Sequence, residues 1–181
     1  MTTQVKVIFI HGNGGATAKD AWIPEVSQAL KNAGIAVITE TFPDNDLARS
    51  SQWLPFIDHL GADSSTIIVG HSSGALAAMR YAESHKLLGS VLVGAAYTDL
   101  GDETEKASGY FDTPWEWGKI RDNQQWIMQF GSIDDPYIPI DEQHFVRDNL
   151  NTNYHEFNDR GHFLTNSFPE LTNAILDKIQ L

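Results

Sequence analysis

The sequence predicts an α/β fold in which helices cover both faces of a mostly parallel sheet of about six strands. Short apolar runs rich in β-branched residues alternate along the chain with segments of helical period. Such alternation is typical of parallel sheets whose strands are joined by right-handed crossover helices. A second observation is the motif Gly70-His71-Ser72-Ser73-Gly74, which stands at one of the predicted strand-to-helix junctions.

The expected elements follow from these apolar runs and periodic segments. Strands are expected at residues 5–10, 35–39, 66–69, 90–93, 126–130 and, with a weaker pattern, 154–157. Helices are expected at residues 20–32, 49–60, 75–85, 141–150 and 169–179. Neither a repeat nor a linker interrupts the order, so residues 1–181 are expected to form a single domain.

Composition narrows the possible functions. The formal net charge is −12, and no cluster of Lys and Arg offsets it, which argues against binding to nucleic acids, membrane surfaces or acidic substrates. The chain has no cysteine, which excludes disulfides, thiolate metal sites and cysteine nucleophiles. The sequence also lacks a signal-peptide pattern and an apolar stretch long enough to span a bilayer, so a cytoplasmic location is expected.

The glycine-flanked Ser72 has the context of a nucleophile elbow, the tight strand-to-helix turn that defines the α/β-hydrolase fold. A predicted strand ends at Val69 and a helical pattern begins at Ala75. The turn requires minimal side chains two residues before and two residues after the serine, and both positions are glycine. The sequence therefore predicts that Ser72 is a catalytic nucleophile and that the backbone N–H of Ser73 is an oxyanion donor.

A serine nucleophile needs a base and a carboxylate that orients the base, in the chain order serine, acid, histidine. Of the histidines that follow Ser72, His162 lies in a loop between the last predicted strand and the last helix, where its ring could reach the serine. Two adjacent residues, Asp134 and Asp135, follow the strand at 126–130 and are candidates for the acid. Pro136 restricts the backbone of Asp135 and favours it as the orienting group.

The loop after the first strand, His11-Gly12-Asn13-Gly14-Gly15, is a candidate for the rest of the oxyanion hole. The backbone N–H of Asn13 is the expected donor. A phosphate-binding loop is the alternative, but the lysine and the following Ser or Thr of that motif are missing. No His or carboxylate spacing matches a metal site, and neither a metal nor a cofactor is expected.

Residues 97–121 break the alternation and are a candidate lid or pocket wall, because they follow a strand end at the expected ligand-binding edge. The alternative is that the aromatic residues of this segment pack onto the core. The aromatic residues expected to line a substrate pocket are Trp53, Tyr97, Tyr110, Phe111, Trp115 and Trp117.

Along nearly its whole length the chain resembles the small serine hydrolases typified by retinoblastoma-binding protein 9. The shared features include the Gly12–Gly15 loop, the Ser72 motif, the stretch from Gly101 to Phe111 and the Gly161-His162-Phe163 motif. The resemblance implies a compact α/β-hydrolase without a large cap domain, and a catalytic triad at Ser72, Asp135 and His162. The LxCxE pattern proposed for retinoblastoma-protein binding is absent, since Ala62 and Ser64 stand where it requires Cys and Glu.

These observations together predict a hydrolase that cleaves small carboxylic esters, or amides or thioesters, through an acyl-enzyme on Ser72. The alternative is a protein-binding module that retains a hydrolase scaffold with little turnover. An intact nucleophile, base, acid and oxyanion loop argue against that alternative, because a scaffold alone has no physical need for all four.

Overall fold

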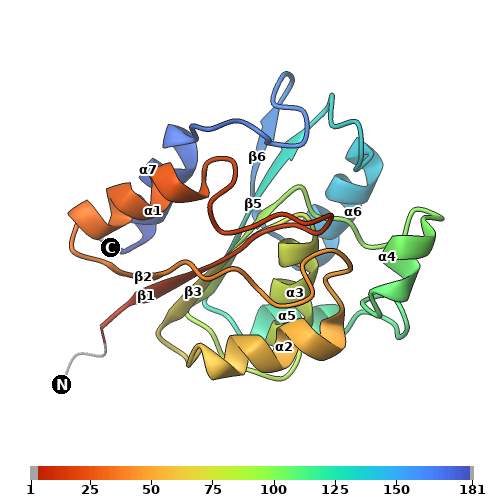
Figure 1. Cartoon of the computed structure of the whole chain (residues 1–181), viewed down its shortest axis with the longest axis horizontal. Coiled ribbons are helices and arrows are strands. Elements are labelled where there is room, and N and C mark those ends of the chain that lie inside the picture. Colours follow the sequence, from red (N-terminus) through yellow and green to blue (C-terminus); the bar gives the residue numbers. More distant parts are fainter. Residues whose placement is uncertain (1–3, 180–181) are drawn as a thin grey trace.

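A computed structural model describes residues 4–179 as a six-stranded sheet flanked by helices (Figure 1). All five strand pairings are parallel, and the strand order is β2-β1-β3-β4-β5-β6. The strands are β1 (Lys6–Ile10), β2 (Ala36–Ile38), β3 (Thr66–His71), β4 (Gly89–Val93), β5 (Trp126–Ser132) and β6 (Asn153–Phe157). The predicted mostly parallel α/β sheet of about six strands is therefore confirmed.

Helices cover both faces of this sheet. The helices are α1 (Ile23–Asn32), α2 (Ser50–His59), α3 (Ser73–Ala82), α4 (Glu103–Ala107), α5 (Trp117–Asp122), α6 (Ile140–Leu150) and α7 (Pro169–Ile179). Helices α1 and α7 pack together on one face, whereas α2, α3, α5 and α6 lie on the other (Figure 1). None of the helices within residues 4–179 is long and apolar enough to cross a membrane.

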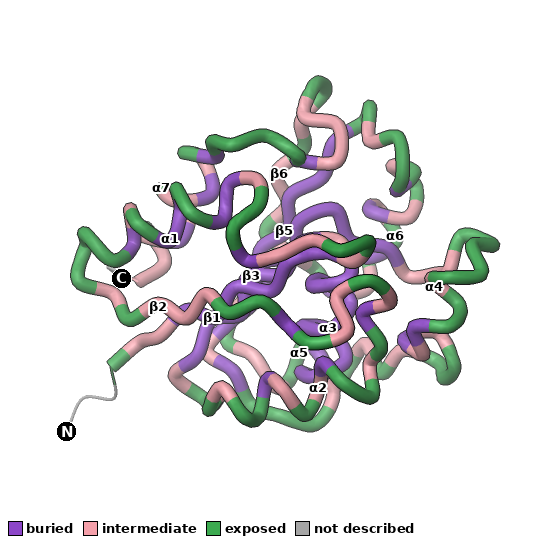
Figure 2. Tube along the Cα trace, viewed as in Figure 1, coloured by how far each residue is buried: buried purple, intermediate pink, exposed green. Residues whose placement is uncertain are grey.

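The two hydrophobic clusters follow from strands that are apolar on both sides. Strands β3 and β4 are buried along their full length at the centre of the sheet (Figure 2). Ile67 and Val69 of β3 face the α1–α7 side, whereas Ile68 packs against the cluster that includes α2 and α3. Because successive strand residues point to opposite faces, a continuous apolar run serves both clusters at once.

Two short helices were not predicted from the sequence. Helix α4 has no buried residue, so it lacks the apolar periodicity by which helices are recognised. Its start is fixed locally, because Asp102 Oδ1 accepts hydrogen bonds from the backbone N–H groups of Thr104 and Glu105. Helix α5 spans six residues and buries only Ile120, which is too short a pattern to identify.

The junction between β3 and α3 is the tightest packing point of the backbone. A Cβ atom on Gly70 would lie 2.2 Å from the carbonyl oxygen of Gly74. A Cβ atom on Gly74 would lie 2.2 Å from the carbonyl oxygen of Ile10 in the neighbouring strand β1. Both contacts are with backbone atoms, which cannot rotate away. The requirement for glycine on either side of Ser72 is thereby confirmed.

Replacing Gly74 by Ala should destabilise the protein by about 3 kcal/mol or more, because the added methyl overlaps the backbone of β1. The measurement is the free energy of unfolding in urea. Gly118→Ala is the matched control, since nothing lies within 4 Å of a Cβ at that exposed helical position. Equal stability of the two variants would contradict the steric account of the motif.

Candidate active site

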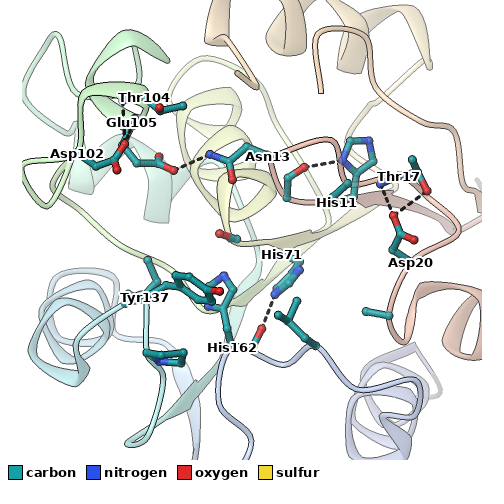
Figure 3. A pocket seen from close by; sticks show the side chains of 18 of the residues that line it. His11, Asn13, Thr17, Asp20, His71, Asp102, Thr104, Glu105, Tyr137 and His162 are labelled. Atoms are coloured by element: carbon teal, nitrogen blue, oxygen red, sulfur yellow. Dashed lines mark hydrogen bonds between the residues drawn. The ribbon is translucent and has the colours of Figure 1, made fainter. Parts of the chain in front are cut away.

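A cavity of about 690 Å³ opens at the carboxyl ends of the central strands. Its walls come from the loop after β1, the β3–α3 junction, the segment containing α4, and the loops after β5 and β6 (Figure 3). The cavity is lined by residues that include His11, Asn13, Asp20, His71, Ser72, Leu100, Asp102, Glu105, Tyr137, Ile138, His162 and Leu164. In parallel α/β sheets this edge is the usual position of a binding site.

Ser72 occupies the N-cap of α3 with a left-handed backbone, at φ 55° and ψ −116°. A non-glycine residue with positive φ is strained, and such strain recurs at functional turns. The conformation is held by a hydrogen bond of 2.9 Å from the Ser72 backbone N–H to the carbonyl of Val93 at the end of β4. The side chain is partly exposed and borders the cavity.

His162, which lines the cavity, forms a hydrogen-bonded pair with the buried Asp135. The distance between His162 Nδ1 and Asp135 Oδ2 is 2.8 Å, so the Nδ1–H donates to the carboxylate and Nε2 is left as the acceptor. The Asp135 side chain is fully buried, and only 9% of the His162 side chain is exposed. Gly94, after β4, makes room for the pair, since a Cβ there would lie 3.2 Å from His162 Cε1.

The second oxygen of Asp135 is also satisfied. Oδ1 accepts hydrogen bonds from the backbone N–H groups of Tyr137 and Ile138, both at 2.9 Å. The two carboxylate oxygens of Asp135 therefore have different hydrogen-bond partners. The backbone donors fix the rotation of the side chain, and Oδ2 is left directed at the imidazole.

The neighbouring Asp134 holds the loop that carries His162 and does not contact the imidazole. Asp134 Oδ1 accepts hydrogen bonds from the Gly161 backbone N–H at 2.8 Å and from Ser132 Oγ at 2.6 Å. These hydrogen bonds hold the pKa of Asp134 below its usual range. Ser132 Oγ in turn accepts from the Arg160 backbone N–H at 3.0 Å. The two adjacent aspartates are thus directed at different parts of one loop.

Ser72 and His162 both line the cavity, but no hydrogen bond joins their side chains. The backbone N–H groups of Asn13 and Ser73 likewise have no acceptor among residues 4–179. Ser73 is the first residue of α3, where the helix itself provides no partner for the amide. Both predicted oxyanion amides therefore remain available for an acceptor.

Two further histidines beside the cavity have fixed hydrogen bonds. His71 Nε2–H donates to the carbonyl of His162 at 2.8 Å, and burial lowers the pKa of His71 to about 4. His11 Nε2 accepts from the Phe42 backbone N–H at 2.9 Å, so its Nδ1–H donates to the Gly12 carbonyl at 2.7 Å. Burial also lowers the pKa of His11. Both rings are therefore neutral structural groups of the cavity wall.

The aromatic pocket wall expected from the sequence is not found at this cavity. The six residues belong to or pack against the hydrophobic cluster on the α2–α3 face: Trp53, Tyr97, Tyr110, Phe111, Trp115 and Trp117. The buried Arg80 holds residues 110–115 against the core. Its guanidinium donates hydrogen bonds to the carbonyls of Tyr110 and Thr113, and its Cζ lies 3.7 Å from the centre of the Trp115 ring. Core packing, the alternative reading, accounts for these aromatic side chains.

Other residues line the cavity in their place. Leu100 and Glu105 come from the polar first half of the segment at 97–121, whereas Tyr137 and Leu164 stand two residues after Asp135 and His162. Proximity in sequence to the candidate triad was the signal that could have identified Tyr137 and Leu164. Within residues 4–179, no group of three or more His, Asp or Glu side chains is placed to hold a metal ion.

Comparison with known proteins identifies the family of the chain. A family model described as "Alpha/beta hydrolase family" matches residues 7–159. The chain belongs to the alpha/beta hydrolase family. Serine hydrolase RBBP9 from Rattus norvegicus is 46% identical over 178 residues, which cover 97% of this chain and 96% of that protein. Within the alpha/beta hydrolases, the chain is therefore an RBBP9-like serine hydrolase.

Solved structures of other proteins share the fold of this chain. The ydeN gene product from B. subtilis superposes with a TM-score of 0.89 at 21% identity, covering 98% of this chain and 100% of that one. Est1E from Butyrivibrio proteoclasticus, solved with ferulic acid bound, superposes with a TM-score of 0.75 at 14% identity, covering 98% and 90% of the two chains.

The buried His71 should make the stability of this hydrolase depend on pH. Because its folded pKa is about 4, below the ordinary value of 6.5, the unfolded chain binds the extra proton between these pH values. Stability should therefore fall as the pH drops from about 6.5 towards 4, by up to about 1.4 kcal/mol per pH unit from this group. Urea unfolding of wild type and His71→Gln across this range is the measurement. Identical pH dependence of the two proteins would contradict the assignment.

Proposed function

We propose that this protein hydrolyses small carboxylic esters through an acyl-enzyme formed on Ser72. His162 acts as the general base and Asp135 as the carboxylate that orients it. The observation that carries the proposal is the 2.8 Å hydrogen bond between His162 Nδ1 and the buried Asp135, in the same cavity wall as the strained Ser72. It leaves His162 Nε2 free to accept a proton on the side of the cavity.

In the proposed cycle the Ser72 hydroxyl attacks the ester carbonyl while His162 Nε2 takes its proton. The hydrogen bond between Ser72 and His162 that this step needs commonly forms or tightens when substrate binds. Asp135 stabilises the resulting imidazolium, which then protonates the departing alcohol. Water, activated by the same histidine, attacks the acyl-enzyme and releases the carboxylic acid.

The oxyanion of each tetrahedral intermediate is proposed to accept hydrogen bonds from the backbone N–H groups of Asn13 and Ser73. Their lack of other acceptors and their position beside Ser72 support this role. A Cβ placed on Gly12 would lie 3.5 Å from Ser72 Cβ, so the loop after β1 directly adjoins the nucleophile. Preorganised donors of this kind stabilise charge that develops only during the reaction.

The lining of the cavity supports a neutral substrate with apolar groups. Three exposed large hydrophobic residues, Leu100, Tyr137 and Leu164, border it. Its acidic lining residues are Asp20, Asp102 and Glu105, and no Lys or Arg is among the lining residues, so an anionic substrate would be repelled. Assays of matched ester, amide and thioester substrates would decide which acyl donor is preferred.

Labelling with a fluorophosphonate probe tests the nucleophile. Wild type should be labelled, whereas Ser72→Ala should not react and should lose at least about 10³-fold in kcat on a small neutral ester. Thermal unfolding should be nearly unchanged, since the partly exposed Ser72 hydroxyl forms no hydrogen bond with any of residues 4–179. Absence of labelling in folded wild type would favour the protein-binding module, and equal turnover of the variant would refute the assignment of Ser72.

Exchanging the two adjacent aspartates for asparagine separates their roles. Asp135→Asn should lower kcat by about 10² to 10⁴-fold, because the amide favours the wrong histidine tautomer and cannot stabilise the imidazolium. Asp134→Asn should change kcat by less than about threefold, since an amide oxygen can still accept both hydrogen bonds that reach Oδ1. Melting temperatures control for unfolding. If Asp134→Asn were the inactive variant, the triad would have to be redrawn.

A further inference from the structure

Glu105 is a carboxylate beside Ser72 that the proposed triad does not use. It lies in α4 and lines both the main cavity and a smaller one of about 20 Å³ that Ser72 also borders. Its Oε1 accepts a hydrogen bond of 2.7 Å from Asn13 Nδ2, which links residues 92 positions apart in the chain. Figure 3 shows the two side chains meeting at one side of the cavity, across from His162.

Burial of this carboxylate has a cost that is opposed by the Asn13 amide first and by the charge of His162 more weakly. Removal from water raises the pKa of Glu105, and the hydrogen bond from Asn13 acts in the opposite direction. The lining of the cavity includes no Lys or Arg. Burying half of a carboxylate against an uncharged amide costs free energy, and a surface helix can be anchored without that cost. Anchoring α4 therefore does not by itself explain why Glu105 contacts Asn13.

Glu105 is itself firmly held. Its backbone N–H donates to Asp102 Oδ1 at 3.0 Å, and its carbonyl accepts a hydrogen bond of 2.5 Å from Ser108 Oγ. The carbonyl of Ser108 in turn accepts from the Ser50 backbone N–H at 2.8 Å, which ties this segment to the start of α2. These hydrogen bonds therefore fix the backbone position from which the Glu105 carboxylate extends.

Unlike Gly14 and Gly15, Asn13 has no backbone hydrogen bond to another loop within residues 4–179, so its position depends on the hydrogen bond to Glu105. Gly14 and Gly15 donate backbone hydrogen bonds to Asp46 and Asn45, at 3.0 and 3.2 Å, and so are held by another loop. Within residues 4–179, Asn13 itself has only a turn hydrogen bond of 3.3 Å from the Ala16 N–H and the bond to Glu105. Gly14 and Gly15 both have positive φ, so this loop is built from residues that allow several conformations.

We propose that Glu105 is a positioning residue of the oxyanion hole, whose carboxylate holds the Asn13 side chain so that the Asn13 backbone N–H points at the substrate carbonyl. This inference rests on the function proposed above. It gives Glu105, in the polar half of residues 97–121, a role in the site, whereas the aromatic half of that segment belongs to the core. The expected effect is on the transition state, because the donor matters most when the oxyanion forms.

The test compares Glu105→Ala, Glu105→Gln, Asn13→Ala and the double variant Glu105→Ala/Asn13→Ala on one small neutral ester. Glu105→Ala should lower kcat by about 10 to 10²-fold with KM changed by less than about threefold, as expected when one oxyanion donor is misplaced. Glu105→Gln should recover most of this loss, since its amide oxygen can accept the same hydrogen bond. Glu103→Ala is the matched control, an exposed glutamate on the same helix that lines neither cavity, and it should match wild type.

The double variant distinguishes positioning through Asn13 from a general structural role. If Glu105 acts through Asn13, each single variant should lose about the same activity and the double variant no more than either. Multiplicative losses in the double variant, equal losses in Glu105→Gln and Glu105→Ala, or wild-type kcat in Glu105→Ala would each overturn the proposal. If Glu105→Ala does not fold, Glu105→Gln and Asn13→Ala still test it, because a kcat of Asn13→Ala equal to wild type would overturn it.

Fluorophosphonate labelling of every variant separates this inference from the function on which it rests. Labelling of Ser72 in wild type, together with wild-type kcat in Glu105→Ala, would refute the role of Glu105 alone. No labelling of folded wild type would refute both. Labelling of Ser72 that is slower in Glu105→Ala and recovers in Glu105→Gln would support the proposal, because phosphonylation also develops charge on an oxygen.

Discussion

The close approach of the β3–α3 turn to the end of β1 constrains the rest of the cavity. Strand β3 pairs with β1, and the start of α3 passes so near to β1 that only a glycine fits at position 74. The loop after β1 must therefore leave the sheet directly beside Ser72. One steric constraint thus brings to one edge of the sheet a strained serine and the backbone amides of Ser73 and Asn13, which have no acceptor within residues 4–179. Because the contacts are between backbone atoms, the arrangement tolerates almost no side-chain variation at the two glycines.

The other half of the site comes from strands on the far side of β3. The loops after β5 and β6 carry Asp135 and His162, and these strands are neighbours at the end of the sheet order. Parallel pairing places the carboxyl ends of all the strands at one edge, so these loops face the serine turn. For this reason, chain order and loop position were enough to predict from the sequence that Ser72, Asp135 and His162 lie at the same edge of the sheet. Their catalytic roles remain predictions.

The sheet and the five longer helices could be predicted because the sequence of each element contains a recognisable pattern of apolar residues. The segment at 97–121 could not, because its conformation depends on distant partners. Arg80 of α3 binds the carbonyls of Tyr110 and Thr113, and no local pattern records that contact. The sequence therefore indicated a pocket wall, whereas the aromatic residues belong to or pack against the hydrophobic cluster on the α2–α3 face. Glu105 was missed for the converse reason, since a polar residue in a polar stretch gives no sign that it reaches the oxyanion loop.

Burial keeps His71, the histidine next to His162, uncharged. The rings of His71 and His162 lie 5.0 Å apart, close enough that two imidazolium ions would repel each other. The lowered pKa of His71 keeps that ring neutral, and its Nε2–H is used to hold the carbonyl of His162. Of these two rings, only that of His162 has a carboxylate partner among residues 4–179, the buried Asp135. The same packing that fixes the loop of His162 therefore keeps positive charge off the ring that lies next to His162.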